Sequence, residues 1–383
     1  MTHGHGAGPE RRPPDYSQAP LLLFWETTRA CPLSCVHCRA SAIPDPLPGE
    51  LSSNEGRRLL DQVATFGDRL PTVIFTGGDP LRRRDLFDLL SYARGLGLHF
   101  GVSPAVSSGL TRDVISQLAG AGVSALSFSL DGSRPETHDA IRRQPGAFEH
   151  TLQAVAEARD LGLRVQLNTM VMLENVEELP GIFHILRGLG VRAWELFFLI
   201  KVGRGAEEDV HDLPAVACES VCNFLYDASR YGIAVRAVEA PFLRRVLRMR
   251  EDRGDYWDDG LYRPLRSDLI ASEGAPNLPS SLAPTGTLDG DGILFVAHDG
   301  EVYPGGLLPF ALGNVKDGNL PAIYRTHELL RQIRRRAFTG VCGVCPVREV
   351  CGGSRARAYA ASGDPLASDP ACVWTPSVLV EGG

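Results

Sequence analysis

The stretch that decides the fold, residues 21 to 42, reads LLLFWETTRACPLSCVHCRASA. It begins with an apolar run that is typical of a buried strand and continues into Cys31, Cys35 and Cys38. The residues before it show no secretory signal core, so we expect a reducing compartment in which thiols stay free. The three thiols are therefore better explained as metal ligands than as part of a disulfide framework.

Beyond this segment, short apolar runs alternate with amphipathic stretches. Strand followed by helix, repeated, predicts parallel strands joined by right-handed crossovers. Roughly six such units precede residue 201, fewer than the eight of a closed barrel, and a further strand in GIAVRAVEA, residues 232–240, finishes the last unit. We therefore expect an α/β fold, a partial (β/α)6 TIM-like barrel that is open on one side.

The charge balance excludes some classes of partner. The net charge is −7 and the isoelectric point is about 5.8. Nucleic-acid binding needs clustered Lys and Arg, so we expect no nucleic-acid partner. No apolar run is long enough to cross a bilayer, so we also expect no membrane partner. The sequence predicts a cytoplasmic protein.

Polar residues follow several of the predicted strands. The second strand ends in Gly77, Gly78 and Asp79, the fourth in Ser129, and the fifth carries Asn168. In parallel α/β folds, ligands bind at the carboxyl ends of the strands, where the first cysteine motif also lies. Paired glycines let the backbone approach a ligand closely. We expect one ligand site at this rim.

The spacing of the first three cysteines suits an iron-sulfur cluster. Three thiolates can hold three irons of a cubane cluster and leave the fourth iron open, since no fourth cysteine follows Cys38 until Cys218. Zinc is the alternative, because CxxC pairs often bind zinc. A zinc site, however, leaves the glycine motif unexplained.

The motif Cys31-xxx-Cys35-x-His37-Cys38, followed by Gly77-Gly78-Asp79-Pro80, resembles the radical S-adenosylmethionine (AdoMet) superfamily over about residues 20 to 205. The resemblance implies a 4Fe-4S cluster whose open iron binds AdoMet. It also implies reductive cleavage of AdoMet to a 5'-deoxyadenosyl radical, which takes a hydrogen atom from the substrate. A flavodoxin- or ferredoxin-type electron donor is implied as a partner.

The same resemblance implies AdoMet contacts at several positions. His37 matches a residue near the adenine, and Gly77, Gly78 and Asp79 match the backbone cradle of the methionine amino group. Arg142 resembles the arginine that pairs with the methionine carboxylate. The remaining candidates are Ser129 and Asn168, as ribose or carboxylate contacts, Ser107, where the family has an Asn-Gly turn, and Gly203-Arg204-Gly205, near the nucleotide.

Four further cysteines, Cys342, Cys345, Cys351 and Cys372, lie near the C-terminus. Their segment resembles the SPASM or twitch extension of radical enzymes, which holds auxiliary clusters. Relatives carry cysteines where this chain has Gly305 and Ser354, so we expect the inner auxiliary cluster to be absent. The four thiolates suffice for one closed auxiliary 4Fe-4S cluster. A zinc ion held by the same thiolates is the structural alternative.

The remaining two cysteines, Cys218 and Cys222, lie four residues apart in an apolar pattern that predicts a helix, so we expect them to be buried. The sequence divides into four predicted parts. These are a disordered tail (1–18), the radical AdoMet barrel (19–240), a variable loop or lid (241–290) and a small C-terminal iron-sulfur domain (291–383).

The wording of both cysteine segments is most similar to the haem-maturation subgroup, whose members remove or alter propionate side chains of tetrapyrroles. The resemblance thus implies oxidative tailoring or decarboxylation of a small-molecule or tetrapyrrole-like acid. Maturation of a ribosomally made peptide is the alternative substrate class. A non-enzymatic iron-sulfur electron carrier is the third hypothesis, although a carrier needs neither the glycine cradle nor the polar rim.

Overall fold

The computed structural model describes residues 15–376, so most of the predicted tail lies outside the described residues. Seven parallel strands follow one another in chain order within one sheet. They are β1 (Leu22–Glu26), β2 (Thr72–Thr76), β3 (Phe100–Val102), β4 (Ala125–Ser129), β5 (Arg164–Val171), β6 (Ala193–Phe198) and β7 (Ala234–Val238). β7 pairs with β6 but not with β1, so the sheet does not close and the prediction of a partial barrel is confirmed.

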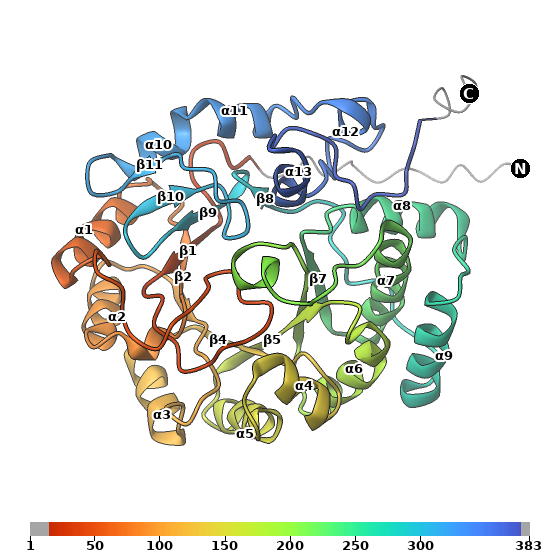
Figure 1. Cartoon of the computed structure of the whole chain (residues 1–383), viewed down its shortest axis with the longest axis horizontal. Coiled ribbons are helices and arrows are strands. Elements are labelled where there is room, and N and C mark those ends of the chain that lie inside the picture. Colours follow the sequence, from red (N-terminus) through yellow and green to blue (C-terminus); the bar gives the residue numbers. More distant parts are fainter. Residues whose placement is uncertain (1–14, 377–383) are drawn as a thin grey trace, which may run out of the picture.

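Helices cover the outside of the curved sheet (Figure 1). They are α1 (Ser53–Ala64), α2 (Leu86–Gly95), α3 (Arg112–Ala121), α4 (Pro135–Arg142), α5 (Ala147–Asp160), α6 (Leu179–Gly188) and α7 (Ala215–Ala228). α1 shows how the local sequence fixes a boundary. The Ser52 side chain accepts from the Glu55 N–H, and the Glu55 side chain accepts from the Ser52 N–H in return.

The C-terminal part continues the same sheet. β9 (Gly292–Val296) pairs in parallel with the free edge of β1, and β8 (Leu288–Asp289) pairs with β9. The antiparallel β10 (Glu301–Tyr303) and β11 (Gly313–Asn314) extend the sheet. Helices α10 (Leu320–Thr326), α11 (Glu328–Arg334), α12 (Gly340–Val344) and α13 (Arg355–Ser362) lie along the top of Figure 1.

The segment 241–290 differs from the expected loop, because it contains α8 (Leu243–Arg253) and α9 (Tyr262–Glu273). Two arginines of α8 form buried ion pairs with α7. Arg245 pairs with Glu219 at 2.5 Å, and Arg250 pairs with Asp227 at 2.7 Å. These pairs depend on packing against another element, which the sequence of the segment alone does not show. The boundaries of the four parts remain predictions.

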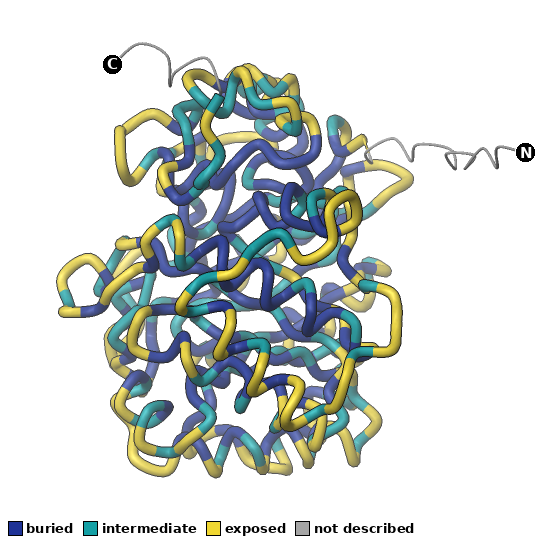
Figure 2. Tube along the Cα trace, turned by 90° about the vertical axis from the view of Figure 1, so that its right-hand side faces the viewer, coloured by how far each residue is buried: buried dark blue, intermediate teal, exposed yellow. Residues whose placement is uncertain are grey.

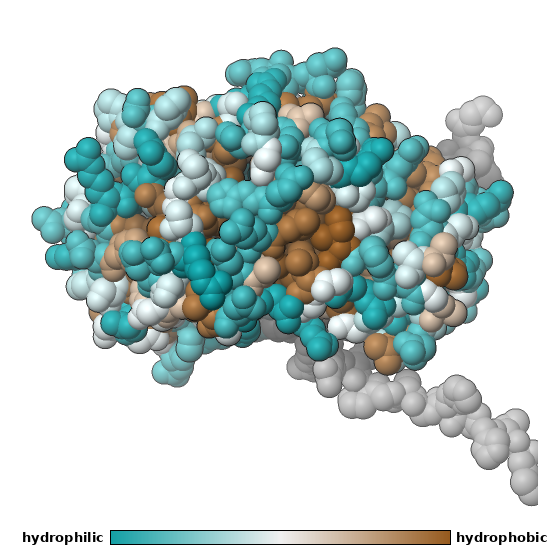
Figure 3. Space-filling view, turned by 90° about the horizontal axis from the view of Figure 1, so that it is seen from below, coloured by the Kyte–Doolittle hydropathy of each residue, from teal (hydrophilic) through white to brown (hydrophobic). Residues whose placement is uncertain are grey.

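The core runs through both the barrel and the C-terminal part as one hydrophobic cluster, and Figure 2 shows the buried chain in the interior. Cys218 and Cys222 are buried in α7, as predicted. Seen from below, the surface is mostly hydrophilic with one concentrated hydrophobic area (Figure 3). Within residues 15–376, no helix has the length and apolar character needed to cross a membrane.

Candidate active site

The cysteine loop follows β1 and folds back on itself. Cys31 and Cys35 are buried, and Cys38 packs beside them. The Leu33 N–H lies 3.4 Å from the Cys31 sulfur, and the Ala42 N–H lies 3.5 Å from the Cys38 sulfur. Backbone N–H groups directed at sulfur favour the thiolate form, so these two contacts would support metal-bound sulfur.

The donor set fits a thiolate-bound cluster. Burial raises the pKa of Cys31 to about 12, and burial also raises the pKa of Cys35 although the nearby Arg142 charge opposes it. The metal-free thiols of Cys31 and Cys35 are therefore protonated, and ligation would displace their protons. In the described chain, no three Cys, His, Asp or Glu side chains are already drawn together as a metal site.

The paired glycines hold this loop against β2. The Gly78 N–H donates to Thr28 O, and the Asp79 N–H donates to Ala30 O, both at 2.7 Å. A Cβ at Gly78 would lie only 2.5 Å from Ala30 O, and a Cβ at Gly77 would collide with Thr28 O. The two glycines are thus required for contact with the cysteine loop itself, in addition to any contact with a ligand.

Asp79 and Ser107 lie behind this surface. The buried Asp79 carboxylate accepts from the N–H groups of Leu81 at 3.2 Å and Ala105 at 3.3 Å, and burial raises its pKa to about 6. Asp79 therefore ties the segment after β2 to the segment after β3. Ser107 caps a local turn by accepting from the Gly109 N–H at 3.3 Å. Neither residue lines the cavity described below.

A second clamp comes from the segment after β6, in the 3-10 turn η3 (Gly203–Ala206). The Arg204 N–H donates to Cys38 O at 2.9 Å, and its guanidinium donates to Cys35 O at 3.0 Å and to Ala42 O. Gly203 has a φ of +55°, and a Cβ there would collide with Arg39 O. The Gly-Arg-Gly segment, expected near a nucleotide, thus holds the backbone of the cysteine loop.

Asp131 anchors the polar centre of the site. Its fully buried carboxylate pairs with Arg142 at 2.5 Å and with His37 at 3.1 Å, and it accepts from the Met170 N–H at 2.8 Å. Burial alone would raise the pKa of Asp131, but the charge of Arg142 and the hydrogen bond from His37 hold it well below its usual range. Arg142 also reaches the Cys35 sulfur at 3.7 Å. The network joins the cysteine loop to strands β4 and β5.

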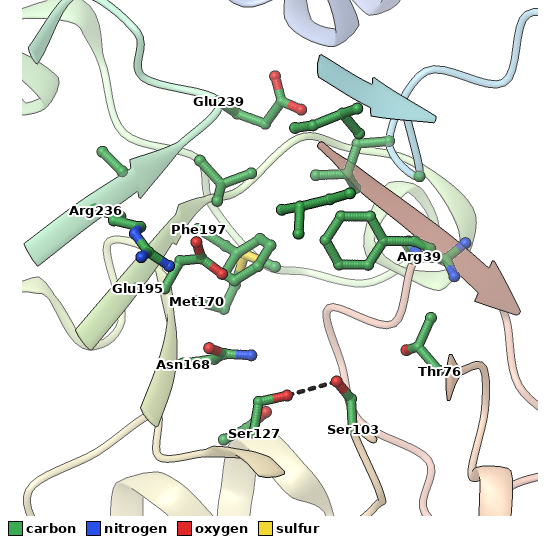
Figure 4. A pocket seen from close by; sticks show the side chains of 18 of the residues that line it. Arg39, Thr76, Ser103, Ser127, Asn168, Met170, Glu195, Phe197, Arg236 and Glu239 are labelled. Carbon is green, nitrogen blue, oxygen red and sulfur yellow. Dashed lines mark hydrogen bonds between the residues drawn. The ribbon is translucent and has the colours of Figure 1, made fainter. Parts of the chain in front are cut away.

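These groups line one cavity of about 740 Å³. The predicted site residues that it brings together are Cys31, Cys35, His37, Cys38, Gly77, Gly78, Ser129, Arg142 and Asn168. Ser129 and Asn168 are direct neighbours across β4 and β5. Figure 4 shows Asn168 and Ser127 at one side of the cavity, and Glu239 at the opposite side. The polar residues that were expected to form one rim at the strand ends thus line a single cavity.

The far side of the cavity contains Glu239 and Asp289, which sequence reasoning missed, and Ser354, which it noted only as a position without cysteine. Glu239 follows β7, Asp289 ends β8, and Ser354 caps α13; all three line the cavity. The Ser354 hydroxyl donates to Glu239, and burial raises the pKa of both carboxyl groups. These positions are far apart in the sequence, so no local motif marks them.

The C-terminal cysteines gather outside this cavity, since none of them lines it. The Cys342 sulfur accepts from the Asp369 N–H at 3.4 Å and from Arg355 at 3.7 Å. Burial raises the pKa of Cys351 to about 12, and the nearby Cys372 adds to the increase. C-terminal cysteines thus lie near one another, away from the cavity where a ligand would bind.

Comparison with known proteins agrees with this geometry. The model of the Radical SAM superfamily matches residues 25–186. An AdoMet-dependent heme synthase of Oleidesulfovibrio alaskensis is 38% identical over 94% of this chain and 89% of its own length. An Fe-coproporphyrin III synthase of Methanosarcina barkeri is 30% identical over 92% of this chain and 86% of its own length.

Solved structures share the fold across both parts of the chain. Streptococcus suis SuiB bound to precursor peptide SuiA superposes with a TM-score of 0.66 and 12% identity, over 93% of this chain and 76% of that chain. The cysteine loop, the strand-end cavity and the likeness over nearly the whole chain lead to one conclusion. The protein belongs to the radical SAM superfamily and is an enzyme of AdoMet radical chemistry.

Proposed function

We propose that the protein converts propionate side chains of an iron tetrapyrrole by oxidative decarboxylation and so produces heme. The observation that carries this proposal is the 38% identity to a heme synthase over 94% of the chain. The cavity supports it, because it extends from the cysteine loop past apolar side chains such as Phe197 and Phe295 to the polar groups of the C-terminal part. A flat, largely apolar acid suits such a lining.

In this proposal, Cys31, Cys35 and Cys38 would hold the 4Fe-4S cluster, which would supply the electron for reductive cleavage of AdoMet. The backbone of Gly77 and Gly78 would form the cradle of the methionine amino group, and Ser129 with Asn168 would contact the ribose or carboxylate. Asp131 fixes His37 and Arg142 at the edge of the cavity. Because Arg142 is already paired with Asp131, it contributes to the methionine carboxylate site only through the rest of its guanidinium.

Cys342, Cys345, Cys351 and Cys372 are proposed to hold one closed auxiliary 4Fe-4S cluster, with zinc as the alternative metal. Four thiolates leave no open iron, so this cluster would carry electrons or organise the fold. A flavodoxin- or ferredoxin-type donor and a cytoplasmic location belong to the same proposal.

The test is anaerobic incubation of the reconstituted enzyme with iron coproporphyrin III, AdoMet and a reductant, followed by mass spectrometry. We expect loss of carbon dioxide and two hydrogens from each converted propionate, together with 5'-deoxyadenosine. The Cys35→Ala variant is the control and should give neither product. Cleavage of AdoMet without any change in the porphyrin would refute the substrate and favour the peptide alternative.

A further inference from the structure

Four interior side chains stand in one layer across the strands that wall the cavity. The backbone register places Ser129 on β4 beside Asn168 on β5, Asn168 beside Glu195 on β6, and Glu195 beside Arg236 on β7. All four line the cavity. Neighbouring strands lie about 4.8 Å apart, so the side chains of Asn168 and Glu195 can reach a shared partner. The proposed AdoMet contact at Asn168 thus has a carboxyl group directly beside it.

Gln166 is the partner that Asn168 and Glu195 share. It lies two residues before Asn168 on the same face of β5, opposite the small Ala193, and it does not line the cavity. Its Nε2 donates to Asn168 Oδ1 at 2.8 Å and to Glu195 Oε2 at 2.9 Å. Both N–H groups of the amide are therefore occupied. Gln166 joins its two neighbours into one chain of hydrogen bonds from behind the ligand site.

This chain of hydrogen bonds has one direction. An ionised carboxylate only accepts, so Glu195 requires the NH2 end of Gln166. The same NH2 group meets Asn168, which must turn its carbonyl oxygen toward it, because two NH2 groups cannot bond to each other. Asn168 then keeps only its own NH2 group for a ligand. Among residues 15–376 no hydrogen bond uses that group, and Figure 4 shows the nitrogen of Asn168 directed into the cavity.

Glu195 faces the barrel interior with few partners. It is half-buried in the cavity wall, and burial raises its pKa, while the charge of Arg236 and the hydrogen bond from Gln166 oppose the rise. Within the described residues it forms no ion pair, and its one hydrogen bond comes from Gln166. A carboxyl group withdrawn from water with so little compensation costs free energy. The contact that uses this carboxyl group is the one that orients Gln166.

We infer that Glu195 and Gln166 are positioning residues, which fix Asn168 as a hydrogen-bond donor toward AdoMet. Asn168 then binds an oxygen of AdoMet that accepts a hydrogen bond, either in the methionine carboxylate or in the ribose. The inference rests on the proposed AdoMet contact of Asn168 and does not depend on the porphyrin substrate.

The test measures AdoMet affinity of the anaerobically reconstituted enzyme by equilibrium dialysis, without reductant so that AdoMet stays intact. Asn168→Ala removes the donor and should weaken binding about two- to tenfold, the range of one hydrogen bond. Gln166→Met keeps the length of the side chain without its amide and should weaken binding within the same range. The matched control is Gln153→Met, because Gln153 donates to Glu157 at the same 2.9 Å on the exposed face of α5. It should bind AdoMet like the wild type.

A double variant separates positioning from a general defect. If Gln166 acts through Asn168, Asn168→Ala/Gln166→Met should bind AdoMet no more weakly than Asn168→Ala does. Analogues of AdoMet then identify the oxygen, since decarboxylated AdoMet lacks the carboxylate and 2'- and 3'-deoxy analogues each lack one ribose hydroxyl. Gln166→Met should leave the affinity unchanged for the analogue without the oxygen that Asn168 binds. A structural defect would weaken all the analogues equally.

Asn168→Asp tests the direction of the bond. An aspartate at this position still accepts from Gln166 but offers AdoMet only an acceptor, so binding should be weaker than in Asn168→Ala. Glu195→Leu removes the acceptor that orients Gln166. It should discriminate among the analogues as Gln166→Met does, and it replaces that variant if Gln166→Met does not fold.

Additive losses in the double variant, or AdoMet binding in Asn168→Asp that equals that of the wild type, would overturn the inference and leave the proposed contact standing. Wild-type affinity in Asn168→Ala would remove the proposed contact and the inference with it. The conversion of the porphyrin is tested separately and is untouched by either result.

Discussion

Replacing Asp131 tests whether the buried network organises the active site. In Asp131→Ala, Arg142 keeps its charge but loses a partner at 2.5 Å, and Met170 N–H loses an acceptor at 2.8 Å. Removing one partner of a buried ion pair costs about 3–5 kcal/mol of unfolding free energy, because the other charge stays buried without compensation. We expect a loss of that size in urea denaturation, together with weaker AdoMet binding.

The matched control is Asp160→Ala, which removes a carboxylate that is 69% exposed and pairs with Arg112 at 3.8 Å. An exposed pair contributes about 0–1 kcal/mol, so little change is expected. The double variant Asp131→Ala/Arg142→Met should recover part of the stability, since it also removes the orphaned charge. A loss below about 1 kcal/mol in Asp131→Ala, or no recovery in the double variant, would refute the reasoning.

Three further predictions concern other parts of the site. Gly78→Ala should displace the cysteine loop, because its Cβ would lie 2.5 Å from Ala30 O, and the reconstituted protein should then bind less iron. The control is Gly95→Ala, where nothing lies within 4 Å of the added Cβ, and its iron content should be unchanged. Cys345→Ala should lower thermal stability and turnover while preserving some AdoMet cleavage, and complete loss of cleavage would contradict separate roles for the two cysteine sets. The pKa of Asp289 is raised in the folded state, so above the unfolded pKa of about 3.9 unfolding releases a proton and thermal stability falls as pH rises. Asp289→Asn should lessen this fall. If the pH profile of the melting temperature is the same in the variant and the wild type, the prediction is wrong.

The cysteine loop and the strand-end polar residues were predictable because they depend on local spacing. Ser129 and Asn168 end up beside each other since parallel strands place their carboxyl ends at one edge. Each of these features is contained in a short segment, so the sequence of that segment was enough to indicate it.

The roles of Asp131 and Arg204 could not be read in the same way. Asp131 was visible at the end of a strand, but its partners lie on a loop and a helix elsewhere in the chain. Arg204 was expected near a nucleotide, which stays a prediction, but its hydrogen bonds to Cys35 O and Cys38 O were not foreseen. Contacts of this kind depend on how elements pack, which no spacing within one segment reveals.

The far side of the cavity shows the same limit more sharply. Glu239 and Asp289 are fifty positions apart and come together only because β8 and β9 join the barrel sheet beside β1. Gly305 and Ser354 led to the expectation that an inner cluster is absent. They did not indicate that Ser354 would contact Glu239.

The most direct test of the central claim is the iron and sulfide content of the anaerobically reconstituted protein. The wild type should bind about eight irons, and a variant without Cys31, Cys35 and Cys38 about four, as one radical cluster and one closed auxiliary cluster require. About four irons with zinc in the wild type would reduce the C-terminal site to a structural metal site. An iron content that stays the same when the three cysteines are removed would contradict the account.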